Sequence, residues 1–209
     1  MARKTKKLHQ RDKFVIFTNG KMTEKNYFQA LRGYRHSIFD ITVKFVNADP
    51  EGLIRRAVKE KDSSNQVWVV FDKDEFPSDK ITAAMIFARK SNVGVALSNA
   101  AFEVWLINHI KEYSSEKTAS ELLQILDSIL KDEGYLAGYS KNDSDMITEV
   151  FLPRLDEAVH NADVSLQKRI AEYNLIHTHS PQHGYPYCDW NSCTTVHKLI
   201  EALKLDSRD

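Results

Sequence analysis

The chain has 209 residues, of which 42% are hydrophobic and 28% charged, and its 29 basic and 29 acidic residues balance to a net charge of zero. This composition excludes a disordered chain and suits one domain of ordinary size, or a core with an appended subdomain. No segment approaches the roughly 20 apolar residues that span a bilayer, and two cysteines indicate no disulfide framework. We therefore expect a protein of the reducing cytoplasm with no membrane partner.

We expect residues 1–12 to form a basic N-terminal arm. The segment "MARKTKKLHQRDK" (1–13) has six basic residues and one acidic residue. Such an arm could contact phosphates, although a frayed, solvated N-terminus is the more common structure.

After this arm, short apolar strands alternate with amphipathic helices. Thr23 is the expected N-cap of the first helix, and Pro50 the expected start of the second. Continuous apolar strands in βα alternation predict an α/β core over residues 13–113, with a four-stranded, mostly parallel sheet and helices on both faces. We expect the strands at 13–20, 40–48, 66–72 and 93–99, and the helices at 23–35, 50–61, 78–91 and 100–113.

Beyond residue 113 the pattern is helical only. The spacing predicts helices over 116–130, over 145–173 with an interruption near Pro153, and over 194–205 with Thr194 near the cap. Residues 177–192 are expected to form a long irregular loop. Because no linker rich in Gly, Ser or Pro intervenes, we expect residues 114–209 to form a helical region packed on the core.

Acidic residues gather where the third strand ends. Asp72 and Asp74 follow this strand, and residues two apart in an extended chain point to the same side. Ligands of parallel sheets bind outside the carboxyl ends of the strands. Both carboxylates can therefore face one cation, and Mg²⁺ suits such a pair because it keeps several waters and takes one or two carboxylates. The spacing alone equally supports a helix cap or turn with both acids in solvent.

Four segments carry a family resemblance, in this order: "TNGKMTEKNYFQALR", "VWVVFDKDEFP", "MIFARKSNVGVALSNAAFEVWL" and "NSCTTVHKLIEAL". Together they resemble the RloB-like proteins of bacterial anti-phage defence loci, from about residue 13 to residue 204. The resemblance implies a Toprim-like core, which is a metal-dependent phosphoryl-transfer domain.

The resemblance also implies roles for individual acids. Asp72 and Asp74 match the Asp-x-Asp motif that holds Mg²⁺ in Toprim-like domains. Glu24 matches a later Glu of the turn after the first strand, and Glu103 matches the acid of the family's "SNPxFE" block. Asn19 occupies the position of the first Glu of that turn, where its amide oxygen could coordinate a cation but cannot act as a base. Either the chain is catalytically disabled, or Glu24 or Glu103 supplies the third carboxylate.

Three lysines are candidate contacts to nucleic-acid phosphates. Lys21 and Lys73 flank the acidic segments, and Lys141 lies with Tyr139 in "GYSKND", which resembles a short Tyr-Lys element of the family. Ordinary surface pairing is the alternative for the first two, and an ordinary interhelical loop for the third.

The histidines and cysteines of the tail raise the question of a zinc site. His179 and His183 have a spacing found in zinc sites, but the surrounding Tyr and Pro residues match no zinc module. We favour a folded loop whose histidines make hydrogen bonds or face RNA.

Taken together, the resemblance implies a nuclease that depends on Mg²⁺ or Mn²⁺ and acts on RNA, with tRNA as one candidate substrate. It implies control by an AAA/ABC-type ATPase encoded in the same defence locus, and it leaves homo-oligomerisation open. The first alternative is a non-catalytic Toprim-like subunit that binds or is regulated by that ATPase. The second is a phosphoryl-transfer enzyme that acts on a small molecule.

Overall fold

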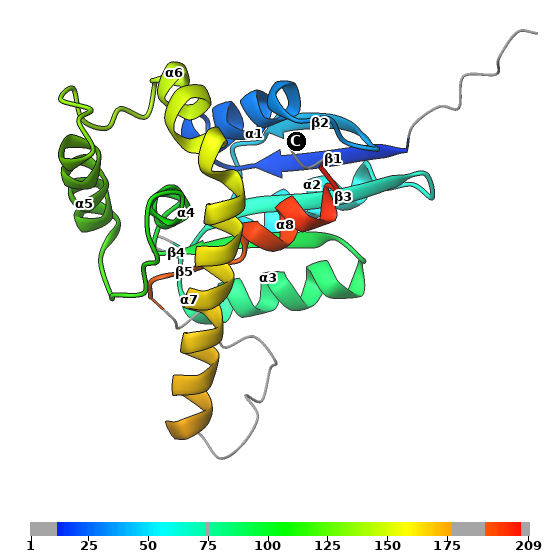
Figure 1. The fold of residues 1–209 in the computed structure, drawn as a ribbon. Helices are drawn as coiled ribbons and strands as arrows, with labels where there is room; N and C mark the ends of the chain where they lie inside the picture. The colour runs from blue at the N-terminus through cyan, green and yellow to red at the C-terminus, as the bar shows by residue number, and fades with distance from the viewer. Residues whose placement is uncertain (1–11, 74–75, 177–190, 206–209) are drawn as a thin grey trace, which may run out of the picture.

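The computed structural model describes residues 12–73, 76–176 and 191–205 (Figure 1). Within these residues, one five-stranded sheet has the order β2-β1-β3-β4-β5. The four predicted strands are present and parallel, and they confirm the α/β class. A fifth strand, which the sequence did not predict, pairs antiparallel with β4. The strands are β1 (Lys13–Thr18), β2 (Asp40–Phe45), β3 (Asn65–Asp72), β4 (Gly94–Asn99) and β5 (Cys193–Thr194).

Two helical layers cover the sheet because its strands are apolar on both faces. In β1, Phe14 and Ile16 belong to the cluster that includes α1 and α4. Val15 and Phe17 belong to the cluster that includes α2 and α3. The helices of the core are α1 (Thr23–Tyr34), α2 (Pro50–Lys59), α3 (Ser78–Lys90) and α4 (Glu103–Asn108).

The helix starts confirm one prediction and correct two. As predicted, α2 begins at Pro50, preceded by Asp49, whose side chain accepts the backbone N–H of Gly52 at 2.8 Å. The predicted N-cap role of Thr23 is wrong, because α1 begins at Thr23 itself and has no side-chain cap. The helix predicted over 100–113 is shorter than expected, since α4 spans Glu103–Asn108.

The C-terminal half contains helices that pack on the α1 face of the sheet. Leu126, Phe151 and Leu199, which come from three of these helices, lie in one apolar cluster with residues of β1. The interruption predicted near Pro153 is present as a π-helix followed by a 3₁₀-helix. The elements are α5 (Ala119–Asp132), α6 (Ser144–Met146), η1 (Ile147–Phe151), η2 (Leu152–Arg154), α7 (Leu155–Ile176) and α8 (Val196–Ala202).

Strand β5 fastens the last helix to the sheet. Ser98 Oγ lies 3.0 Å from Thr194 Oγ1, and Thr195 Oγ1 accepts the backbone N–H of Leu97 at 2.9 Å. As expected, Thr194 lies next to the N-cap of the last helix, which is Thr195. It belongs to β5, and its Oγ1 accepts a hydrogen bond from the N–H of Val196. None of the helices in the described ranges has the length and hydropathy needed to cross a membrane.

Candidate functional site

Asp72 is the last residue of β3, where it pairs in register with Ser98 of β4. Because side chains alternate along a strand, Asp72 is on the same side as Val70, which packs in the cluster of α1 and α4. The residue is half-buried, but its Oδ1 atom is enclosed and has no hydrogen-bond partner. An enclosed carboxylate oxygen without a partner is costly, so this atom is suited to bind a ligand.

Glu24 lies in the first turn of α1 and is 7% exposed. Its carboxylate packs directly over Gly20, where an added Cβ would lie only 1.8–2.0 Å from the carboxylate atoms. Burial is the main cause that raises the pKa of Glu24, and the nearby Glu103 raises it further. The glycine of the "NG" turn thus provides the space in which this carboxylate sits.

Glu103 is the first residue of α4 and is 2% exposed. Its Oε1 atom lies 3.2 Å from the ammonium of Lys141 and accepts the hydroxyl of Tyr139 at 3.5 Å. Burial raises the pKa of Tyr139, and the Glu103 carboxylate adds to this effect, so the phenol stays protonated as a donor. Both partners come from the α5–α6 loop (residues 133–143), which forms a wall of the site.

The three carboxylates act on one another although they come from β3, α1 and α4. The pKa of Asp72 is raised well above its usual range by burial first, and then by the charges of Glu24 and Glu103. A hydrogen bond from the Phe102 backbone and the charge of Lys141 act in the opposite direction. We call Glu24, Asp72 and Glu103 the carboxylate cluster. Its mutual repulsion would be relieved by a cation.

The cluster fits a hard cation in chemistry. Oxygen ligands suit Mg²⁺ and Mn²⁺, and Mg²⁺ needs only one or two carboxylates because it keeps several waters. The enclosed Asp72 Oδ1 is the atom with an unused lone pair. Within the described ranges, no three His, Cys, Asp or Glu side chains are grouped closely enough to hold an ion together. Asp74, the second acid of the predicted motif, lies outside the described residues.

Sequence reasoning did not find Thr23 as a member of the site. Since Thr23 does not cap α1, its hydroxyl is available to another group, and it lies 3.3 Å from the Tyr139 hydroxyl. Tyr139 therefore bridges the first turns of α1 and α4. Thr23 stands beside Glu24 in the sequence, but this position does not reveal the contact, because its partner Tyr139 is 116 residues away along the chain.

The other predicted site residues are not members of the carboxylate cluster. Asn19 is half-buried after β1, where its backbone N–H donates to Val70 O at 3.4 Å. Lys21 is exposed, and the backbone N–H of Lys73 donates to Ser98 O at 2.8 Å. Neither lysine makes an ion pair with the carboxylate cluster, whereas Lys141 does. The histidines of the zinc hypothesis, His179 and His183, lie outside the described residues.

A second polar group lies next to the carboxylate cluster, formed by Tyr27 of α1 and by His109, which follows the end of α4. The hydroxyl of Tyr27 lies 2.9 Å from His109 Nε2, and His109 Nδ1 lies 3.0 Å from Trp105 O. Because a carbonyl can only accept, Nδ1 carries the proton and Nε2 accepts from the tyrosine. Burial lowers the pKa of His109 to about 3, so the ring is neutral at physiological pH. The sequence left this histidine unassigned.

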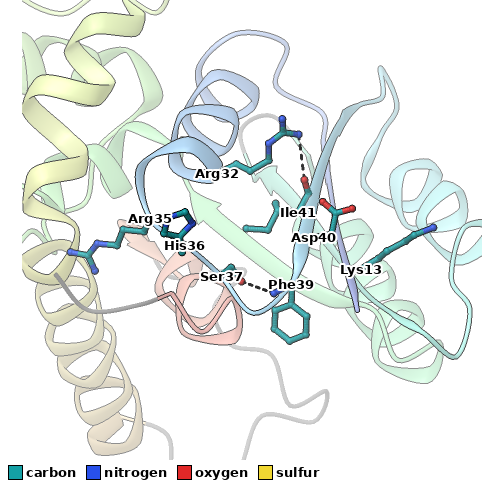
Figure 2. A pocket seen from close by; sticks show the side chains of 8 residues that line it. All are labelled: Lys13, Arg32, Arg35, His36, Ser37, Phe39, Asp40 and Ile41. Carbon is teal, nitrogen blue, oxygen red and sulfur yellow. Dashed lines mark hydrogen bonds between the residues drawn. The ribbon is translucent and has the colours of Figure 1, made fainter. Parts of the chain in front are cut away.

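The pocket drawn in Figure 2 is separate from the carboxylate cluster. It has a volume of about 460 Å³ and lies at the amino-terminal ends of β1 and β2, away from the carboxylate cluster. Its lining is rich in basic residues, but their side chains diverge. Arg32 donates to the Ile41 carbonyl at 3.5 Å, and the Arg35 side chain points in another direction (Figure 2). Arg35 makes hydrogen bonds of 2.8 and 2.7 Å with Asp156.

Comparison with known proteins identifies one family. The family model described as "RloB-like protein" matches residues 14–203. No curated protein and no solved structure matches the chain. The matched range includes the carboxylate cluster, the α5–α6 loop and strand β5.

Proposed function

Because the chain belongs to the RloB-like family, we propose that it is a divalent-metal-dependent nuclease that cleaves RNA, with tRNA as a candidate substrate. Its role would be that of the effector in a bacterial anti-phage defence system, controlled by an AAA/ABC-type ATPase of the same locus. The observation that supports the chemistry is the convergence of three buried or half-buried carboxylates, Glu24, Asp72 and Glu103, at the carboxyl end of the sheet.

In this proposal Asp72 and Asp74 hold Mg²⁺ or Mn²⁺, and Glu24 and Glu103 are further carboxylates of the site. The bound cation would supply Lewis acidity and an activated water for attack on phosphorus. The protein's own residues position these carboxylates. Gly20 leaves room for the carboxylate of Glu24, and the hydroxyl of Tyr139 restrains the carboxylate of Glu103.

The raised pKa of Glu24 suits it to move a proton during the reaction. A buried carboxyl takes up and releases a proton closer to neutral pH than an exposed one, and general acid–base catalysis is most efficient there. We assign Lys141, Lys21 and Lys73 to contacts with the phosphates of the substrate. Lys141 is the best placed, because its ammonium already lies at the cluster.

One observation favours a second candidate function. Asn19 occupies the position where the family resemblance places a Glu, and an amide can neither carry the negative charge nor accept the proton. If that carboxylate is essential, the chain is a non-catalytic subunit that binds its ATPase partner. The position of Glu24 supports the nuclease instead, because its carboxylate lies over Gly20, the residue next to Asn19.

The proposal is tested by incubating the metal-free protein with total cellular RNA, with Mg²⁺, with Mn²⁺ or with EDTA, and mapping discrete products. We expect metal-dependent cleavage that falls about 100-fold or more in Asp72→Asn, because Lewis-acid assistance supplies several kcal/mol. Glu116→Gln, which removes an exposed carboxylate outside the cluster, should cleave like the wild type.

The Asn19→Glu variant separates the two candidate functions. Cleavage by the wild type shows that Asn19 is tolerated and supports the enzyme. Cleavage only by Asn19→Glu, abolished by Asp72→Asn, shows a disabled nuclease and supports the non-catalytic subunit. If neither protein cleaves RNA, alone or with its ATPase, the nuclease proposal is wrong.

A further inference from the structure

The carboxylate cluster already contains one cation, the ammonium of Lys141. It lies 3.2 Å from Oε1 of Glu103 and also lowers the pKa of Glu24 and of Asp72. The two partners differ sharply in environment. The Glu103 side chain is 2% exposed, whereas that of Lys141 is 53% exposed. The lysine therefore reaches into the site from solvent, and a long exposed side chain can leave again at low cost.

The loop that carries Lys141 is fixed independently of this ion pair. Asp127 of α5 accepts the backbone N–H of Tyr139 at 2.9 Å and pairs with Lys131 at 2.7 Å. Gly138 has φ +71°, a conformation that favours glycine, and a Cβ there would lie 1.9 Å from Asp127 Oδ1. The wall of the site would therefore remain in place if the ammonium of Lys141 moved away.

A divalent cation bound at the cluster would compete with this ammonium for the Glu103 carboxylate. Among the described residues, Lys141 pairs with Glu103 and its charge also acts on Glu24 and Asp72, while Oδ1 of Asp72 has no hydrogen-bond partner. A cation beside Asp72 and Glu103 would compensate this charge more fully than a lysine can, and it would repel the ammonium at close range. The charge that stabilises Glu103 without metal is thus a charge that opposes metal binding.

We propose that Lys141 is an exchangeable counter-ion, which neutralises Glu103 in the metal-free protein and is displaced from it when a divalent cation binds. This inference rests on the proposed function, since it concerns the same metal. It assigns to Lys141 a role that precedes any contact with substrate, namely to set the affinity of the site for the cation.

The test compares Lys141→Met with Lys168→Met by the electron paramagnetic resonance signal of free Mn²⁺, titrated into EDTA-treated protein at low ionic strength. Methionine keeps most of the length of the side chain and removes its charge. Lys168 is a matched control, because it is 55% exposed and pairs with the carboxylate of Glu112, outside both the cluster and the α5–α6 loop. We expect Lys141→Met to bind Mn²⁺ about fivefold more tightly than the wild type, while Lys168→Met does not differ from it.

The outcomes distinguish the inference from the function on which it rests. If the wild type binds Mn²⁺ and Asp72→Asn does not, the metal site is present. Equal or weaker binding by Lys141→Met would then overturn the counter-ion role alone. If the wild type shows no Mn²⁺ binding that depends on Asp72, the proposed metal site fails and the inference fails with it.

Discussion

Two buried polar groups lie next to each other along α1 and α4, and they differ in charge and in how fully their polar atoms are hydrogen-bonded. The first is the carboxylate cluster, to which α1 contributes Glu24 and α4 contributes Glu103. The second, which we call the histidine pair, consists of Tyr27, one turn after Glu24, and His109, which follows the end of α4. In the histidine pair both side chains are neutral and their polar atoms are hydrogen-bonded. In the carboxylate cluster, like charges meet and Asp72 Oδ1 has no partner.

The difference separates a structural role from a functional one. Buried polar groups whose hydrogen bonds are satisfied hold elements in a fixed arrangement, and here the histidine pair joins α1 to α4. Buried groups with perturbed pKa values and unsatisfied atoms are typical of sites that bind ligands. The histidine pair thus fixes the distance between the two helices whose first turns carry Glu24 and Glu103.

The largest expected effect is on stability, from removal of the histidine. His109→Ala leaves a cavity and a buried Tyr27 hydroxyl without its partner, and we expect it to lower the free energy of unfolding by about 4 kcal/mol. Urea denaturation followed by circular dichroism measures this loss. His160→Ala, at an exposed position of α7, should change it by less than about 0.5 kcal/mol. A similarly small change for His109→Ala would show that the histidine pair is not structural.

The pH dependence of stability should come partly from the same residue. The pKa of His109 is lowered to about 3 in the folded protein, so the unfolded chain binds the additional proton as the pH falls below the usual value near 6.5. Between pH 7 and pH 5 this group should cost the wild type about 2 kcal/mol of stability. The stability difference between the wild type and His109→Gln should shrink by this amount. A difference that stays constant over this range would mean that His109 titrates normally.

The sequence predicted the elements of the sheet well, because their signals are local. Apolar runs closed by polar turns placed all four parallel strands, and Pro50 marked the start of α2. Strand β5 has only two residues, Cys193 and Thr194, and two residues carry no recognisable periodicity. Its position depends on the edge of β4, which the local pattern of residues 191–195 does not contain.

The candidate site likewise contains residues that local sequence patterns predict and residues that they do not. Asp72 was predictable, because the end of an apolar strand is a local feature. That Glu24 and Glu103 belong to one site required the family resemblance, since nothing in their own segments shows that they meet. The contacts of Tyr139 with Thr23 and of Lys141 with Glu103 depend on how the α5–α6 loop folds back across the first turns of α1 and α4. Such contacts follow from tertiary packing, which spacing along the chain does not encode.

The smallest expected effect has the opposite sign and sharpens the contrast between the two groups. Without metal, Asp72→Asn should raise the free energy of unfolding by about 1 kcal/mol at pH 8, because it removes a charge repelled by Glu24 and Glu103. The folded-state pKa of Asp72 is raised, so its contribution to stability is present below pH 4 and is lost as the pH rises through the folded-state pKa. The gain in Asp72→Asn should therefore grow with pH.

Denaturation in EDTA from pH 4 to pH 8 measures this gain, and Glu116→Gln should show none. Added Mn²⁺ should stabilise the wild type and leave Asp72→Asn unaffected, because ligand binding stabilises only a folded state that binds the ligand. If Asp72→Asn instead destabilises the metal-free protein at every pH, the carboxylate of Asp72 has stabilising partners in the folded protein, as His109 has. The carboxylate cluster would then be a structural element like its neighbour, and the case for a cation at this site would be lost.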